Sequence, residues 1–294
     1  MHRWAAEVAV EEELVRRLVA GQFPELELRS LRLLDEGWDN AVWVVDERWA
    51  FRFPRRELGA SLGERELAVL PLVAPLLPLP VPLPRFLGRP AEGYPWPFWG
   101  AALLPGREGS EAGDRAPLAR PLGEFLRVLH SLEIDVELPF DPSGRADPAR
   151  RVPHAREALA DLERLGLWRV PAPAERVLGE ALLLPPATEA VLAHGDLHFR
   201  HLLVEEDRLT GVIDWGDVCR APRSLDLQVV WSFFPPGARA AFLDAYGPVD
   251  EDTLLRARML AISLCAVLAA YGHHEGMPSV EREAIAGLER AARP

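Results

Sequence analysis

Acidic and histidine side chains gather in two short motifs in the second half of the chain. The motif HGDLHFRHLLV covers residues 194–204, and the motif GVIDWGD covers residues 211–217. Each motif joins a carboxylate-bearing loop to a short apolar run with the composition of a strand, and a polar turn separates the two runs. We expect an antiparallel hairpin, which would bring Asp196 and Asp214 to the same end of a small sheet.

Two carboxylates placed in this way can divide the work of a phosphoryl transfer. One carboxylate can orient a hydroxyl nucleophile and accept its proton. The other, together with a third ligand, can hold Mg²⁺ on phosphate oxygens. The chemistry predicted from these two motifs is therefore transfer of a phosphoryl group to an alcohol.

The first hundred residues predict a small sheet with helices. Residues 8–19 have the apolar spacing of an amphipathic helix, and residues 27–54 contain three short runs typical of antiparallel strands. A helix follows and is predicted to end at Pro71 and Pro75. Residues 77–98 are so rich in proline that only extended strand or polyproline conformations are expected.

The second part of the chain is predicted to be mainly helical. Its helical segments surround the strand-like stretch of residues 191–217 and cover residues 121–133, 154–167, 251–272 and 280–291. Strands early and helices late predict an α+β fold with a small sheet lobe and a larger helical lobe. The boundary is expected near residues 100–106.

The two motifs resemble those of the aminoglycoside phosphotransferase family, small-molecule relatives of the protein kinases. GWDNAVW, FRFPRR, ERELAVL, YPWPF and LLPG also occur in the order that the family uses, so the resemblance covers roughly residues 25–230. It implies a protein-kinase-like fold with an antiparallel-sheet N-lobe (1–102), a hinge near 100–106 and a helical C-lobe (107–294). The nucleotide would bind in the cleft between the lobes.

The resemblance also implies roles for individual residues. Asp196 matches the catalytic aspartate that orients the substrate hydroxyl, and Asp214 matches the aspartate that chelates Mg²⁺. His194 and Asp226 match residues that brace the catalytic loop. For nucleotide binding, Arg52 matches the strand residue that contacts the phosphates, and Glu66 matches its acidic partner. Gly37 to Asn40 match the loop over the phosphates, and Ala102 to Leu104 match the hinge. For the acidic partner, Glu64 remains an alternative to Glu66.

Two residues depart from the family pattern. His201 stands where most members have an asparagine as the second metal ligand, and imidazole prefers softer ions than Mg²⁺. Histidine at this place is nevertheless typical of macrolide kinases of the same superfamily. Arg52 replaces a lysine; it keeps the positive charge and can bind phosphate with two parallel hydrogen bonds, but it is bulkier. We expect both residues to be compatible with catalysis, with His201 and Asp214 as the metal ligands.

The function implied by the resemblance is Mg²⁺-dependent transfer of the γ-phosphate of ATP or GTP to a hydroxyl of a small cationic molecule. The acceptor would be an aminoglycoside- or macrolide-like antibiotic, or a metabolic amino alcohol or sugar. A kinase-like module that binds nucleotide without transferring phosphate is an alternative, because of His201 and Arg52.

A metal-dependent hydrolase is a further alternative. His194, Asp196, His198 and His201 lie close in sequence, and such clusters can bind zinc. The segment His273-His274-Glu275 is the only other source of ligands that we consider, and it is expected at an exposed helix end. His198 itself is expected to face solvent.

Composition limits the partners of the chain. The formal net charge of −12 over 294 residues argues against nucleic acid or an anionic membrane as a partner. No run approaches ~20 uninterrupted apolar residues, and the first residues turn acidic before an apolar stretch forms, so we expect neither a membrane span nor a secretory signal. Two cysteines are typical of a reducing cytoplasm. All 33 basic residues are arginine, and the oligomeric state stays open.

Overall fold

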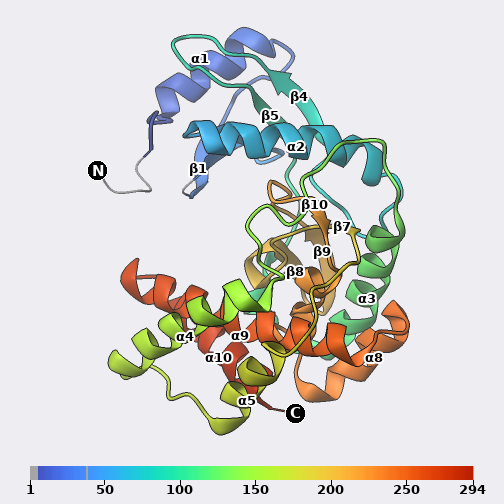
Figure 1. Ribbon diagram of the computed structural model, residues 1–294. Coiled ribbons are helices and arrows are strands. Elements are labelled where there is room, and N and C mark those ends of the chain that lie inside the picture. The colour runs from blue at the N-terminus through green and yellow to red at the C-terminus, as the bar shows by residue number, and fades with distance from the viewer. Residues whose placement is uncertain (1–5, 38, 294) are drawn as a thin grey trace. The chain divides into compact units, whose positions relative to one another are not determined.

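The computed structural model describes residues 6–37 and 39–293, which divide into two compact units (Figure 1). The N-terminal unit comprises the described residues of Met1–Leu76, together with Pro80–Pro105 and Ile213–Asp217. The C-terminal unit comprises Leu77–Leu79, Gly106–Val212 and the described residues of Val218–Pro294. Asp214 therefore belongs to the N-terminal unit, whereas Asp196 belongs to the C-terminal unit.

Five antiparallel strands form the sheet in the described part of the N-terminal unit, in the order β1-β2-β3-β5-β4. They are β1 (Leu31–Glu36), β2 (Asn40–Val45), β3 (Trp49–Pro54), β4 (Pro84–Gly88) and β5 (Phe98–Ala102). The three strands predicted within residues 27–54 are confirmed as β1 to β3. The predicted extended conformation of the proline-rich stretch is confirmed at β4.

Helices α1 (Glu12–Gln22) and α2 (Glu57–Val73) cover opposite faces of this sheet. Side chains alternate along β3, so Phe51 and Phe53 share one face and Arg52 points to the other. The two phenylalanines join an aromatic core with Phe23, which directly follows α1. Arg52 instead reaches Glu66 of α2. The sheet thus has an apolar face and a face that carries buried charges.

Two boundaries in the N-terminal unit differ from the sequence prediction. α1 begins at Glu12 rather than at residue 8. Of the two prolines predicted to end α2, Pro71 lies inside the helix, which continues to Val73 and stops before Pro75. Proline removes only the hydrogen bond of its own missing N–H, and Ala74 still donates to the Leu70 carbonyl at 2.9 Å. Leu70 and Val73 are fully buried, and this packing anchors the last turn.

The C-terminal unit is mainly helical, which confirms the predicted α+β class. Its longer helices are α3 (Ala116–Ser131), α4 (Pro148–Arg164), α5 (Ala172–Ala181), α8 (Pro236–Tyr246), α9 (Glu251–His274) and α10 (Pro278–Ala292). Its short helices are η1 (Gly109–Glu111), η2 (Phe199–His201), α6 (Ser224–Leu227) and α7 (Val229–Ser232). Its strands are β6 (Arg107–Glu108), β7 (Val191–Ala193), β8 (Leu202–Glu205), β9 (Arg208–Val212) and β10 (Cys219–Ala221).

Helix α9 is long and apolar enough to cross a membrane by length and composition alone. In the structure, however, 56% of its most apolar window is buried. α9 packs against α10, α4, α7, α6 and α5, and Figure 1 shows α4 and α10 beside it. These contacts identify α9 as the central core helix of the C-terminal unit.

Strands β8 and β9 form the antiparallel hairpin that the sequence predicts. Leu202 at the start of β8 pairs with Val212 at the end of β9. The ends of the two strands that lead to the Asp196 and Asp214 motifs therefore lie at the same end of the hairpin. That Asp196 and Asp214 act on one ligand stays a prediction.

Candidate active site

The loop between β7 and β8 carries Asp196, and its backbone requires a glycine. Gly195 has φ of 88°, a left-handed conformation that other residues adopt only with strain. The following residues form the single turn η2, and the Nδ1 atom of His198 accepts a hydrogen bond from the Arg200 N–H at 3.2 Å. The loop thus turns sharply at Gly195 and is fixed again by a histidine cap before β8 begins. We call residues 194–201 the catalytic loop.

Asp226 of α6 holds the start of the catalytic loop. Its carboxylate is fully buried and accepts backbone N–H bonds from His194 at 2.8 Å and from Gly195 at 3.0 Å. The Nε2 atom of His130 lies 3.1 Å from the same carboxylate. Burial acts to raise the pKa of Asp226, but its hydrogen bonds, that with His130 foremost, hold it below its usual value. These contacts fix the start of the loop, and we call Asp226 with its partners the brace; that the brace serves catalysis stays a prediction.

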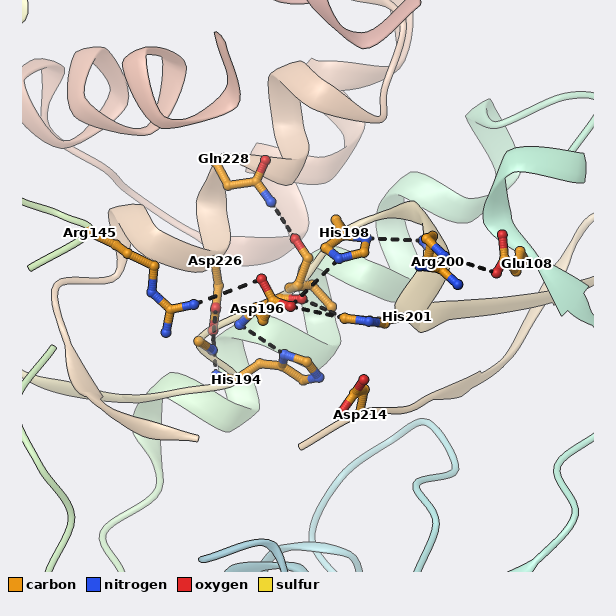
Figure 2. Close-up of polar contacts among 12 residues, drawn as sticks. Glu108, Arg145, His194, Asp196, His198, Arg200, His201, Asp214, Asp226 and Gln228 are labelled. Carbon is orange, nitrogen blue, oxygen red and sulfur yellow. Dashed lines mark hydrogen bonds and ion pairs between the residues drawn. The ribbon is translucent and has the colours of Figure 1, made fainter. Parts of the chain in front are cut away.

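The carboxylate of Asp196 is surrounded by cationic and hydrogen-bonding groups (Figure 2). His198 Nε2 lies 3.6 Å from Oδ2, His201 Nδ1 lies 3.8 Å from Oδ2, and Arg145 Nη1 lies 3.8 Å from Oδ1. Burial acts to raise the pKa of Asp196, but the three neighbours outweigh it and hold that pKa well below its usual value. Asp196 is therefore ionised at neutral pH and can accept a proton or a hydrogen bond from an alcohol.

Three histidines of the loop are oriented by short-range bonds. His194 is fully buried, and its Nδ1 atom accepts the Asp196 N–H at 3.3 Å. The Nδ1 atom of His201 lies 2.6 Å from the Asp196 carbonyl oxygen, which can only accept, so Nδ1 donates its proton there and the ring is held in one orientation. The expectation that His198 faces solvent is wrong, because its side chain is only 7% exposed and caps η2.

Among the residues that the structure describes, Asp196, His198 and His201 form a group that could hold a metal ion together. One ligand atom from each lies within 4.8 Å of the others. The pair His273 and His274 does not join them: His273 pairs with Glu281 at 2.9 Å and His274 with Asp161 at 3.1 Å. For the hydrolase alternative, the structure thus provides three possible metal ligands. His273 and His274, which were considered as additional ligands, are bound to other acidic side chains.

In the N-terminal unit, Arg52 is bound to two acidic residues. Its Nη2 atom donates to Asp214 Oδ1 at 2.9 Å, and its Nη1 atom lies 3.4 Å from Glu66 Oε2. The guanidinium also stands over the Trp99 ring, 5.7 Å from its centroid. Trp99 can approach this closely because Gly63 of α2 has no side chain; a Cβ there would lie 2.3 Å from the indole. Asp214 itself has φ of 64°, a strained conformation that is common at functional sites.

Glu66, and not Glu64, is the acidic partner of Arg52. Glu66 is fully buried, whereas Glu64 is exposed on the same helix. Burial raises the pKa of Glu66 to about 7 although Arg52 acts in the opposite direction. Asp214 adds to the increase. The strand arginine is thus shared between a buried glutamate near its titration point and the more exposed Asp214.

The other predicted nucleotide-binding positions lie at the turn between β1 and β2 and at the end of β5. Gly37 donates its N–H to the Asn40 carbonyl at 2.9 Å, which closes the turn between β1 and β2. The buried Oδ1 atom of Asn40 has no hydrogen-bond partner. Trp38, inside the predicted phosphate loop, lies outside the described residues. Ala102 is the exposed last residue of β5, and Leu104 follows it, half-buried, in the segment toward β6.

Sequence reasoning missed the roles of four residues around the catalytic loop. His130 and Tyr246 extend the Asp226 brace, with 2.8 Å between His130 Nδ1 and the Tyr246 hydroxyl. Gln228 donates its Nε2–H to the Leu197 carbonyl. Arg145 comes from an irregular segment before α4. His130 and Tyr246 lie on regular amphipathic helices and Arg145 in a loop, so only the folded chain brings them to the site.

Comparisons with known proteins place these observations in a family. The model of the phosphotransferase enzyme family matches residues 30–260. An aminoglycoside 3'-phosphotransferase of Escherichia coli is 28% identical over 196 residues, which cover 64% of this chain and 70% of the relative. A further aminoglycoside 3'-phosphotransferase of Escherichia coli is 32% identical over 151 residues, 49% of this chain and 54% of the relative.

Two solved structures show the same fold over nearly the full chain. The GDP complex of aminoglycoside 2'-phosphotransferase-IIIa has a TM-score of 0.71 and 20% identity, and covers 96% of this chain and 99% of its own. The macrolide 2'-phosphotransferase from Brachybacterium faecium, an apoenzyme, has a TM-score of 0.61 and 23% identity, with 94% and 98% covered. These likenesses confirm the predicted protein-kinase-like fold class.

Proposed function

The chain belongs to the phosphotransferase enzyme family, and we propose that it transfers the γ-phosphate of ATP or GTP to a hydroxyl of a small molecule. An aminoglycoside- or macrolide-like antibiotic is the proposed acceptor class, supported by the named activities of its relatives. GDP and ADP complexes of similar structures support a nucleotide as co-substrate. The two cysteines, both buried, support the proposed cytoplasmic location.

The observation that carries this proposal is the ionised carboxylate of Asp196. A loop braced by Asp226 presents it, and three neighbouring side chains keep it charged. A general base must be deprotonated and within reach of the hydroxyl whose proton it accepts. We assign Asp196 this role, with His194 and Asp226 as positioning residues of the loop.

We assign the nucleotide and its metal to residues of both units. Asp214 would supply a hard carboxylate oxygen and His201 an oriented imidazole nitrogen. This donor set fits Mg²⁺, but it favours Mg²⁺ over softer divalent ions less than a set of oxygen ligands alone would. When bound, Mg²⁺ would neutralise charge on the phosphate oxygens. Arg52 would bind the α- and β-phosphates and Glu66 would orient it, while Gly37, Asn40, Ala102 and Leu104 would contact the nucleotide. The lobes would be residues 1–102 and 107–294, with the hinge near 100–106.

A zinc-dependent hydrolase is the second candidate, favoured by one observation. The donor atoms of Asp196, His198 and His201 lie within 4.8 Å of one another, and a carboxylate with two imidazoles is a known zinc ligand set. Metal analysis of the purified chain separates the two functions. Stoichiometric zinc retained through dialysis would support the hydrolase, and its absence would leave the kinase.

The kinase is tested by transfer of radiolabelled γ-phosphate from ATP and from GTP to a panel of aminoglycosides, macrolides and amino alcohols. We expect Mg²⁺-dependent labelling of at least one acceptor. The Asp196→Ala variant should lower the transfer rate by about 10²–10⁴-fold, because it removes the general base. A chain that binds nucleotide but labels no acceptor and releases no phosphate would instead be the inactive kinase-like module.

A further inference from the structure

His198 of the catalytic loop is held from both sides of its ring. Its Nδ1 atom accepts the backbone N–H of Arg200 at 3.2 Å, and its Nε2 atom lies 3.6 Å from Asp196 Oδ2 (Figure 2). The ring is buried and packs against the rings of His201 and Phe199, whose centroids are 3.9 Å and 5.6 Å away. The side chain is therefore fixed in one orientation, with its two nitrogens directed at different partners.

The hydrogen bond from Arg200 determines which nitrogen of His198 carries a proton. A backbone N–H can only donate, so Nδ1 of His198 must present its lone pair to Arg200. A ring with a free lone pair at Nδ1 is neutral and carries its one proton on Nε2. The N–H group of His198 thus faces the carboxylate of Asp196.

The Asp196 carboxylate needs a directional donor, because the last torsion of an aspartate side chain has broad minima. Arg145 lies 3.8 Å from Oδ1, and His201 lies 3.8 Å from Oδ2. The Nδ1 proton of His201 is directed at the Asp196 carbonyl oxygen, 2.6 Å away, rather than at the carboxylate. Of these three neighbours His198 is the nearest to the carboxylate, and its Nε2 proton is the one directed at Oδ2.

We infer that His198 is a positioning residue of the reaction, whose Nε2–H sets the plane of the Asp196 carboxylate so that the carboxylate meets the acceptor hydroxyl. The inference deepens the proposed function and rests on it for the role of Asp196 as general base. The gap of 3.6 Å is longer than a hydrogen bond of about 3 Å, and contacts of this kind commonly shorten when an enzyme binds its substrate.

The same tautomer counts against His198 as a zinc ligand. A metal at Nδ1 would take the lone pair that Arg200 uses, and a metal at Nε2 would place the ring proton on Nδ1. Either arrangement breaks the cap of η2. The cap thus favours His198 as a donor to Asp196 over His198 as part of a metal site.

Two amide substitutions separate the cap from the donor. An asparagine amide lies near the place of Nδ1 and a glutamine amide near the place of Nε2, so His198→Asn retains an acceptor for the cap and His198→Gln retains a donor to Asp196. For His198→Asn we expect a Tm near that of the wild type, but a kcat lowered by about 10- to 100-fold with unchanged KM for nucleotide and acceptor, because the base loses its alignment. His198→Gln should lower the Tm by about 2–4 °C and recover most of the kcat.

Transfer kinetics and thermal unfolding of the full chain decide between these roles. His154→Asn is the matched control, since His154 is exposed on α4, and it should change neither quantity. The reverse order of the two variants, with a loss of kcat in His198→Gln and none in His198→Asn, would show that His198 is only a cap and would overturn the inference. A higher Mg²⁺ requirement in His198→Asn would place the effect at the adjacent His201 ring and would overturn it as well.

The tautomer can be measured without turnover. In full-length protein labelled with ¹⁵N-histidine, the signals of His198 are assigned by their loss in the two variants. At pH 8 they should show the Nε2-protonated form alone, in contrast to the mixture of tautomers of an unrestrained ring. Transfer activity together with a proton on Nδ1 of His198 would refute this inference alone. The expected spectrum without any transfer by the wild type would instead refute the proposed function.

Discussion

Glu66 in the N-terminal unit and Asp196 in the C-terminal unit both lie next to an arginine, yet their pKa values shift in opposite directions. Burial raises the pKa of Glu66 to about 7, whereas the neighbours of Asp196 hold its pKa well below the usual value. Glu66 is 3.4 Å from Arg52, and that arginine is closer to Asp214, at 2.9 Å. Asp196 has Arg145 and two histidines around it. The number of donors around each carboxylate, rather than the presence of one arginine, accounts for the opposite shifts.

The difference suits the two proposed roles. A carboxylate that orients a phosphate-binding arginine can exchange its proton without losing its place, because packing holds it. A general base must stay ionised and therefore needs several donors around it. The brace at Asp226 follows the pattern of Asp196, since hydrogen bonds keep its pKa low although it is fully buried. The comparison can be tested through the pH dependence of stability and through the brace.

The largest expected effect is the pH dependence that Glu66 contributes to folding. Its pKa is about 7 in the folded chain and close to 4.5 when unfolded, so the folded chain binds the extra proton between these values. The stability from this group is present below the unfolded pKa and is lost as the pH rises through 7. Between pH 5 and pH 8, the free energy of unfolding of Glu66→Gln should improve relative to the wild type by about 2–3 kcal/mol.

Urea unfolding of both proteins at pH 5 and pH 8 measures this change. Glu64→Gln is the matched control, because Glu64 is exposed on the same helix. Its difference from the wild type should stay within about 0.5 kcal/mol at both pH values. A difference between Glu66→Gln and the wild type that is the same at pH 5 and pH 8 would show that the pKa of Glu66 is not raised into this range and that the contrast with Asp196 is wrong.

The next effect concerns the brace of the catalytic loop. His130→Phe keeps the volume of the ring but removes the donor that faces the buried Asp226 carboxylate at 3.1 Å. Hydrogen bonds to a charged group contribute about 1.5–3 kcal/mol, and we expect a loss of this size in the free energy of unfolding. Because Asp226 positions the loop and not the nucleotide, kcat should fall while the KM for nucleotide stays near the wild-type value.

Chemical unfolding and steady-state transfer kinetics test both parts of this prediction. The control is His154→Phe, since His154 is 68% exposed on α4 and pairs only weakly with Glu157. It should change neither quantity appreciably. A His130→Phe variant as stable and as active as the control would show that the two backbone N–H bonds alone suffice to hold Asp226.

The sequence predicts the parts of the site that consist of short, contiguous patterns. The hairpin of β8 and β9, the strands β1 to β3 and the brace residue Asp226 all follow from such patterns. Glu66 and Glu64 could not be distinguished by sequence, because spacing places both on one helix and only packing shows which of them is buried. Similarly, the sequence does not show which of Pro71 and Pro75 ends α2, because it is the burial of Leu70 and Val73 that carries the helix past Pro71.

Residues that reach the site from distant segments could not be predicted. Arg145 lies in an irregular segment whose shape depends on the carboxylate of Asp141. His130 lies in an amphipathic helix, where a lone histidine has no pattern of its own. His198 was expected at the surface, because its role as the cap of η2 depends on the turn that follows Gly195. In each case tertiary contacts, and not local composition, determine the role.

The smallest expected effect is that of the Tyr246 hydroxyl at the end of the brace. The ionised Asp226 carboxylate can only accept, so His130 Nε2 donates to it, and the Tyr246 hydroxyl lies 2.8 Å from His130 Nδ1 on the other side of the ring. Burial raises the pKa of Tyr246, so the phenol keeps its proton.

Tyr246→Phe should lower the free energy of unfolding by about 0.5–1.5 kcal/mol and leave kcat nearly unchanged. In the His130→Phe background the same substitution should cost nothing further, because its partner is gone. Equal costs in both backgrounds would mean that Tyr246 stabilises α8 on its own account and that the brace ends at His130.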